Sequence, residues 1–104
     1  MHDVKITVIK RTVNRDIVEK YVKDKYQEMG SCERLKEGQE FLITKENRYQ
    51  PPKDFCQWAW ADIRHDILTL AYGAKVPHMK NEDTNIVACT DWFRPVYFKI
   101  ERIE

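Results

Sequence analysis

Three cysteines are the side chains in this sequence best suited to chemistry. Cys32 follows a glycine and a serine, Cys56 stands 24 residues later, and Cys89 another 33 residues on. Each lies at the edge of a different predicted element, where a fold can gather groups from distant segments into one pocket. A thiolate is both a nucleophile and a metal ligand. We therefore predict that the three approach one another and serve as the catalytic residues of a shared site.

The sequence also allows other roles for these thiols. Cys56 opens a predicted helix, and the positive end of a helix dipole favours a thiolate, so we expect Cys56 to be the most reactive. A free cysteine also packs as a small hydrophobe, which is the competing interpretation. Three thiolates could bind zinc, but structural zinc sites usually place two ligands close in sequence, and none are close here. We therefore predict no metal, and the cofactor stays unknown.

Three further residues are predicted to contact a ligand. Asp91 and Arg94 bracket a turn that leads into Pro95. The guanidinium of Arg94 can present a fork to a carboxylate or phosphate, or the two residues can simply brace the turn, since aspartate commonly starts such turns. Trp58 falls in the otherwise polar stripe of its predicted helix, so we expect it to contact a ligand or a partner.

A histidine and two aspartates on the same predicted helix also invite a catalytic interpretation. Asp62, His65 and Asp66 share one narrow polar stripe at helical spacing. Such a stripe is typical of a solvent-facing helix surface, and we favour that interpretation. The sequence has no glycine-rich phosphate loop, serine nucleophile elbow, HExxH or Cys-x-x-Cys motif, so enzymatic activity stays undecided.

Four segments have the alternation or β-branched content typical of strands: residues 4–8, 40–44, 86–90 and 96–103. Ile9 interrupts the first alternation and predicts a bulge. Gly38 leads into the second strand. The last two strands are separated by a short turn, which predicts a hairpin.

Two segments have helical character. The first runs from a predicted cap at Asn14 to about residue 26, with an apolar stripe formed by Ile17, Tyr21 and Val22. The second covers residues 56–72, with Asp54 as predicted N-cap and a glycine at its end.

The second predicted helix is unusually apolar. Beside its broad apolar face, Ala61 and Leu68 add a separate apolar patch. We therefore predict burial on more than one side, by the sheet and by a second subunit.

These elements predict one α+β domain over residues 1–104. A mainly antiparallel sheet of about four strands packs against one long apolar helix, with the first helix at the periphery. A chain of this length, 42% of it apolar, can bury a core without disulfides or metal.

The charge balance restricts the partners. The formal net charge is +1, so the composition predicts no nucleic-acid partner and no attraction to a membrane surface. No stretch approaches the roughly 18 apolar residues of a membrane span, and the first residues lack the layout of a signal peptide. We expect a cytoplasmic protein with reduced thiols.

The sequence resembles a family of small prokaryotic proteins of about this length. The resemblance runs nearly end to end and rests on these motifs: Gly30-Ser31-Cys32, Glu37-Gly38-Gln39-Glu40-Phe41, Phe55-Cys56-x-Trp58-Ala59-Trp60-Ala61-Asp62-Ile63, Cys89-Thr90-Asp91 and Arg94-Pro95-Val96 with the strand that follows. It implies no activity, but it implies that all three cysteine positions belong to the family pattern. The pattern has glycine where Trp92 stands, so the turn after Asp91 departs from it.

Two functions from different classes follow from these observations. The first is a cysteine-based ligand or thiol site for a small molecule of unknown identity. The second is a homodimeric interaction module that associates through its tryptophan-rich helix, with cysteines that only pack. Fast labelling of a native thiol would favour the first function.

Overall fold

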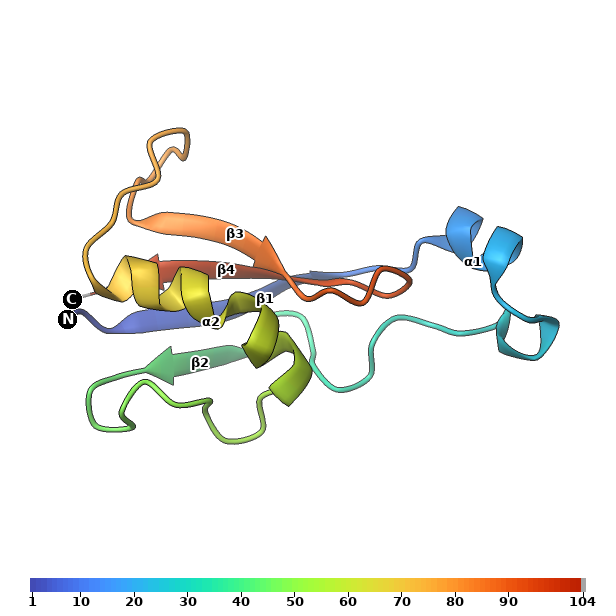
Figure 1. The fold of residues 1–104 in the computed structure, drawn as a ribbon, viewed down its shortest axis with the longest axis horizontal. Helices are drawn as coiled ribbons and strands as arrows, with labels where there is room; N and C mark the ends of the chain where they lie inside the picture. Colours follow the sequence, from blue (N-terminus) through green and yellow to red (C-terminus); the bar gives the residue numbers. More distant parts are fainter. Residues whose placement is uncertain (104) are drawn as a thin grey trace.

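The computed structural model describes residues 1–103 and shows an α+β architecture, as predicted. Its four strands form one antiparallel sheet in the order β2-β1-β4-β3 (Figure 1). The elements are β1 (Val4–Arg11), α1 (Arg15–Tyr21), a 3-10 turn η1 (Asp24–Tyr26), β2 (Glu40–Ile43), α2 (Gln57–Ala71), β3 (Thr84–Ala88) and β4 (Val96–Arg102). Glu104, the last residue of the predicted domain, lies outside the described residues.

The strand predictions are confirmed with small shifts at the ends. Alternate residues of β1 and β4 point into the core, and the register between these strands shifts between Val8 and Lys10. The bulge predicted at Ile9 is therefore present. β3 begins two residues before the predicted start, because Thr84 already pairs with Glu101 of β4. The predicted hairpin of β3 and β4 is also confirmed.

The second predicted helix forms as α2, but a different residue begins it. Cys56 is the N-cap, whereas Asp54, the predicted cap, has a φ of +67° and caps nothing. The backbone turns just before the helix, where the Phe55 N–H donates to the Pro52 carbonyl at 3.2 Å. Gly73 follows the helix with a φ of +102°, which is the left-handed geometry that glycine tolerates best.

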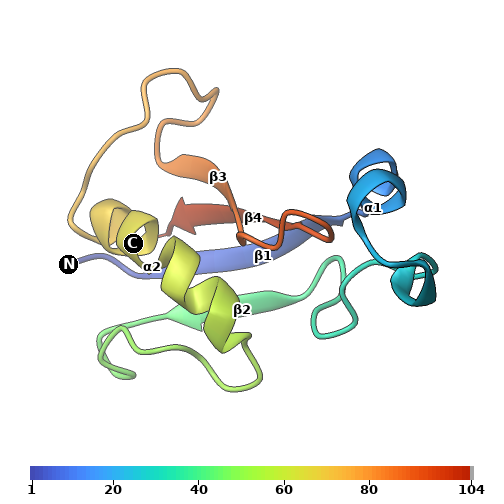
Figure 2. The ribbon, with the colours of Figure 1, turned by 45° about the vertical axis from the view of Figure 1, so that its right-hand side comes forward.

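One face of α2 is buried within the described chain, and the burial of a second side by another subunit stays a prediction. The buried residues of α2 share one hydrophobic cluster with the sheet: Ala59, Trp60, Ile63, Ile67, Leu70 and Ala71. Ala61 is exposed and Leu68 only half-buried. The sheet lies on one side of the helix, and Figure 2 shows no other element of residues 1–103 over its opposite side. The second apolar patch therefore stays at the surface of the described chain.

The first predicted helix is shorter than expected and buries a different residue. α1 has seven residues, and the chain becomes extended at Val22. The side-chain amide of Gln27 donates to the Val18 carbonyl at 2.8 Å and to the Val22 carbonyl, so this segment folds back on itself. Val18 is buried, whereas Ile17 and Tyr21 of the predicted stripe are exposed.

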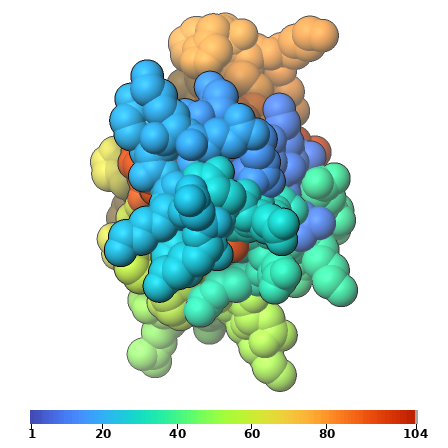
Figure 3. All heavy atoms as spheres, turned by 90° about the vertical axis from the view of Figure 1, so that its right-hand side faces the viewer, coloured from blue at the N-terminus to red at the C-terminus, as the bar shows by residue number. Residues whose placement is uncertain are grey.

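The segment with α1 and η1 forms a lobe beyond one end of the sheet, and its blue and cyan atoms face the viewer in Figure 3. Asn14 precedes α1 as predicted, but its side chain makes no capping bond to the helix. Instead, its amide donates to the Trp92 carbonyl at 2.6 Å, and its backbone N–H donates to the Phe93 carbonyl at 2.9 Å. Asn14 thus fastens the lobe to the turn between β3 and β4.

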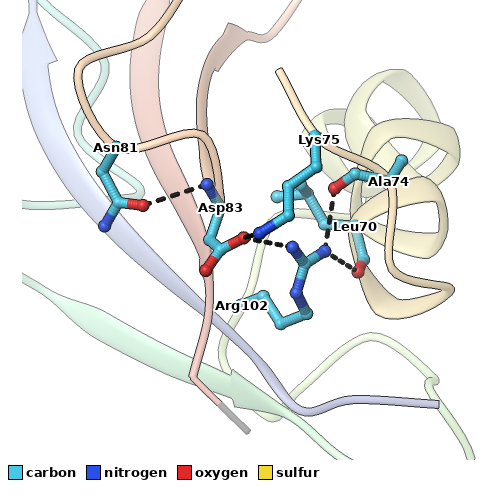
Figure 4. Close-up of polar contacts among 6 residues, drawn as sticks. All are labelled: Leu70, Ala74, Lys75, Asn81, Asp83 and Arg102. Carbon is cyan, nitrogen blue, oxygen red and sulfur yellow. Dashed lines mark hydrogen bonds and ion pairs between the residues drawn. The ribbon is translucent and has the colours of Figure 1, made fainter. Parts of the chain in front are cut away.

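A cluster of charged groups joins the C-terminal end of α2 to β4 at the other end of the molecule (Figure 4). Arg102 donates to the Leu70 carbonyl at 2.7 Å and to the Ala74 carbonyl at 2.8 Å, and its guanidinium also pairs with Asp83. Lys75 approaches the same Asp83 oxygen at 2.5 Å. Arg102 therefore adds side-chain donors to carbonyls at the end of the helix, where the Leu70 carbonyl also accepts the Gly73 N–H at 2.9 Å.

Asp83 makes the stability of this end dependent on pH. The hydrogen bond from Lys75, and after it the hydrogen bond and charge of Arg102, hold the pKa of Asp83 below its usual 3.8, against the opposing effect of burial. A carboxylate with a lowered pKa stabilises the fold above its unfolded pKa, and this contribution disappears as pH falls through the folded pKa. We expect Asp83→Asn to lower the urea midpoint at pH 7. The gap from the wild type should close as pH falls below 3.8. A gap that stays constant across this range would contradict the assignment.

Candidate functional site

A pocket of about 630 Å³ opens where three segments distant in sequence meet. Residues 32–34 form one part of its wall, the first turn of α2 another, and the turn of residues 89–94 the third. All six residues singled out from the sequence line this pocket: Cys32, Cys56, Trp58, Cys89, Asp91 and Arg94. The fold therefore brings together the predicted catalytic and ligand-binding residues.

The three thiols have different surroundings in the pocket wall. Cys89 is 9% exposed, and its sulfur accepts a hydrogen bond from the Val96 N–H at 3.4 Å. Cys32 and Cys56 are half-buried, and within residues 1–103 their sulfur atoms accept and donate no hydrogen bond. Cys89 therefore has a structural role at the start of the β3–β4 turn. Cys32 and Cys56 pack partly against the hydrophobic core, and both line the pocket.

The backbone around Cys32 is fixed from two sides. Its carbonyl accepts a hydrogen bond from Arg11 of β1 at 2.7 Å. Three residues later, Leu35 is fully buried in the hydrophobic core. Residues 32–34 therefore form an anchored wall of the pocket, although they belong to no helix or strand.

Asp62 of α2 holds the turn over the helix. Its carboxylate accepts the Thr90 N–H at 2.8 Å and the Thr90 hydroxyl at 3.0 Å. These bonds join residues that are 28 positions apart in sequence. A carboxylate that accepts both donors of one threonine fixes the height of the turn above the first half of α2.

Asp91 shapes the turn itself. One of its carboxylate oxygens accepts the N–H groups of Phe93, at 3.1 Å, and Arg94, at 3.0 Å. Trp92 does not have a positive φ. The turn therefore accommodates a tryptophan without backbone strain.

Arg94 both braces the turn and retains free donors. Its Nε lies 3.5 Å from the second oxygen of Asp91, which fits the bracing interpretation. Its two terminal nitrogens have no partner among residues 1–103. Arg34, exposed on the opposite segment, makes no hydrogen bond or ion pair with the described residues. The pocket thus has two guanidinium groups with unused donors.

Aromatic side chains line the pocket close to solvent. Trp58 is 76% exposed, Trp92 is 68% exposed and Phe93 is 37% exposed. Trp58 therefore lies outside the core, and its contact with a ligand or a partner stays a prediction. Large indole surfaces that remain in water are typical of binding sites rather than of packing.

The start of α2 adds positive potential to the same wall. No side chain caps its first turn, and that turn contains no acidic residue. The N–H groups of a first turn have no partner within the helix, and the helix dipole makes this end positive.

Metal and histidine chemistry find little support in the described part of the chain. Among residues 1–103, no three His, Cys, Asp or Glu side chains gather closely enough to hold a metal ion. The His65 side chain is exposed on α2 and makes no hydrogen bond or ion pair with the described residues, while Asp62 bonds to Thr90. The stripe on α2 is therefore mainly a solvent-facing surface.

Sequence reasoning missed three residues of this site. Arg34 stands two positions after Cys32, and Thr90 directly precedes Asp91, so closeness to the predicted residues was the available signal. Asp62 was considered only as a partner of His65. Its bond to Thr90 spans 28 positions, and no local pattern reports it.

Comparisons with protein-family models, curated proteins and solved structures found no match to this chain. Within residues 1–103, no helix has both the length and the apolar character needed to cross a membrane.

The structural role of Cys89 predicts a difference between two substitutions. Cys89→Ala leaves the Val96 N–H without its acceptor, so we expect the free energy of unfolding to fall by about 1–2 kcal/mol. Cys89→Ser keeps an acceptor in place and should cost less than Cys89→Ala. Urea unfolding followed by circular dichroism measures both. Equal losses for the two variants would contradict a structural role for the sulfur.

Proposed function

We propose that this protein binds a small organic molecule in the pocket and presents the thiols of Cys32 and Cys56 to it. The observation that supports this most strongly is the convergence of six residues, chosen from three separate segments, on one pocket. Its volume of about 630 Å³ falls within the range of typical ligand pockets.

The composition of the wall fits this proposal. Small-molecule sites combine apolar and aromatic surface with a few polar groups that orient the ligand. Here tryptophan side chains supply the surface, and Arg94 and the two available thiols supply the orienting groups. In this proposal Cys56 is the first nucleophile, Cys32 acts from the facing segment, and Cys89 positions the turn.

Thiol labelling of the native protein tests the proposal. Monobromobimane is added at neutral pH, and the modification of each cysteine is followed by peptide mass spectrometry. Cys32 and Cys56 should react at least about ten times faster than Cys89, because a buried thiol reacts only after local opening. In urea the three rates should converge. If all three thiols react only on unfolding, the proposed function is wrong.

The homodimeric module is the second candidate, and one observation favours it. Trp58 and Trp92 are mostly exposed, and Ala61 lies uncovered on α2, so a second copy could bury this surface. Light scattering at micromolar concentration decides between the candidates. A dimer that dissociates in Trp58→Ala would support the module, and a monomer would contradict it.

The resemblance to the small prokaryotic family belongs to the same proposal. If it holds, family members share the thiol pair and should show the same labelling pattern. Cytoplasmic location and the lack of a nucleic-acid partner stay predictions from composition.

A further inference from the structure

We infer that the ligand of this pocket has an aromatic body and an anionic group such as a carboxylate, sulfonate or phosphate. The inference rests on the proposed function, because it specifies what the pocket binds. Its basis is the combination of unused guanidinium donors with exposed indole surfaces around one cavity.

The charges on the wall are not equally available. Only the Nε of Arg94 pairs with Asp91, and the two terminal nitrogens of Arg94 have no partner among residues 1–103. Both carboxylate oxygens of Asp91 already have partners. One accepts two backbone N–H groups, and the other pairs with Arg94. Arg34 has no counter-charge within hydrogen-bond distance, and the same holds for its exposed neighbour Glu33.

Two guanidinium groups in the lining of one pocket suit an anion with several oxygens. The guanidinium of arginine presents parallel N–H donors that match the two oxygens of a carboxylate or the oxygens of a phosphate. Arg34 and Arg94 come from different walls of the pocket, so an anion between them would join the two walls. The positive end of α2 adds to the attraction, although the two guanidinium groups carry the inference.

The aromatic half of the inference rests on the placement of two tryptophans. Trp58 stands on the first turn of α2, and Trp92 stands on the turn across from it. The backbone at Trp92 is held by Asn14 on one side and by the carboxylate of Asp91 on the other. A rigid, exposed indole on a cavity wall offers a stacking surface at little entropic cost.

A matched pair of fluorescent probes tests the inference on the whole protein. The anionic probe is 1-anilinonaphthalene-8-sulfonate, and the neutral probe is N-phenyl-1-naphthylamine, which has the same aromatic body without the sulfonate. We expect the anionic probe to bind at least about ten times more tightly, since a hydrogen bond to a charged group is stronger than one between neutral groups. Arg34→Gln combined with Arg94→Gln should abolish this preference and leave the neutral probe unaffected. Glu33→Gln removes a negative charge from the same wall and should therefore strengthen the binding of the anionic probe.

The outcomes separate this inference from the proposed function. Equal binding of the two probes, or a preference that survives the double arginine substitution, would overturn the anionic class. If that happens while Cys32 and Cys56 still label rapidly, the thiol pocket stands and only its ligand class is wrong. If neither probe binds, the aromatic body is also refuted. Trp58→Ala should weaken both probes, and unchanged binding would refute the stacking role.

Discussion

Phe55→Ala is expected to lower the free energy of unfolding by about 3–5 kcal/mol, a large part of the stability of a small domain. The Phe55 ring contacts three aromatic neighbours in the core, with centroid distances of 4.9 Å to Phe41, 5.5 Å to Phe98 and 6.2 Å to Trp60. Removing it leaves a cavity that these stiff side chains cannot fill. Urea unfolding followed by circular dichroism measures the loss.

The same substitution should also disturb the pocket, because Phe55 immediately precedes Cys56 at the start of α2. We expect the rate at which Cys56 is labelled to differ from that of the wild type, while the lobe formed by α1 and η1 keeps its structure. Tyr21→Ala is the matched control, since its ring is exposed and its loss should change stability by less than about 0.5 kcal/mol. A loss below about 1 kcal/mol for Phe55→Ala would show that the aromatic cluster does not hold the helix.

Asp62→Ala is expected to release the turn that covers the pocket. The substitution removes the acceptor of two Thr90 donors, and hydrogen bonds to a charged group each contribute roughly 1.5–3 kcal/mol. We expect a stability loss at the lower end of that range, because Thr90 is exposed and water can replace the carboxylate. The larger effect should appear at Cys89, whose labelling rate should rise by at least about tenfold once the turn opens locally.

Two variants make this prediction specific. Asp62→Asn keeps one carbonyl acceptor and should show an intermediate labelling rate at Cys89. Asp66→Ala, one turn later on α2, removes a carboxylate with no partner among residues 1–103 and should behave like the wild type. An unchanged Cys89 rate in Asp62→Ala would mean that the turn is held by other contacts.

The sheet was predictable because its signal is local. Alternation in β1 and β4 places every second side chain in the core, and a sequence shows this directly. The bulge at Ile9 was visible for the same reason, since it breaks the alternation. α2 was also predictable within one residue at each end, because its apolar face and Gly73 are adjacent in sequence.

The wrong predictions concern contacts that helix propensity and a helical wheel do not show. At the end of the first helix, the Gln27 side chain donates to the carbonyls of Val18 and Val22, and the Val18 carbonyl also accepts the Val22 N–H at 3.0 Å. Asp54 fails as a cap because the backbone turns before it can reach the first helical N–H groups. A helical wheel shows the apolar patch at Leu68 but not what covers it. The half-buried state of Leu68 was therefore not predictable from the sequence.

In the candidate site, the positions of the cysteines were predictable from the sequence, but their individual contacts were not. All three cysteines line one pocket, which the sequence could suggest because residues at the edges of elements tend to meet in loops and pockets. Their separate roles were not predictable, because the bond from the Val96 N–H to the Cys89 sulfur depends on the geometry of the finished hairpin.

The central claim, that Cys32 and Cys56 face one shared pocket, is tested most directly by cross-linking with dibromobimane. This short reagent becomes fluorescent when both of its arms have alkylated a thiol. The account predicts a fluorescent product with one Cys32–Cys56 cross-link within a single chain, which disappears in Cys32→Ser and in Cys56→Ser and persists in Cys89→Ser. Single adducts without a cross-link, or a cross-link between two chains, would contradict the shared pocket.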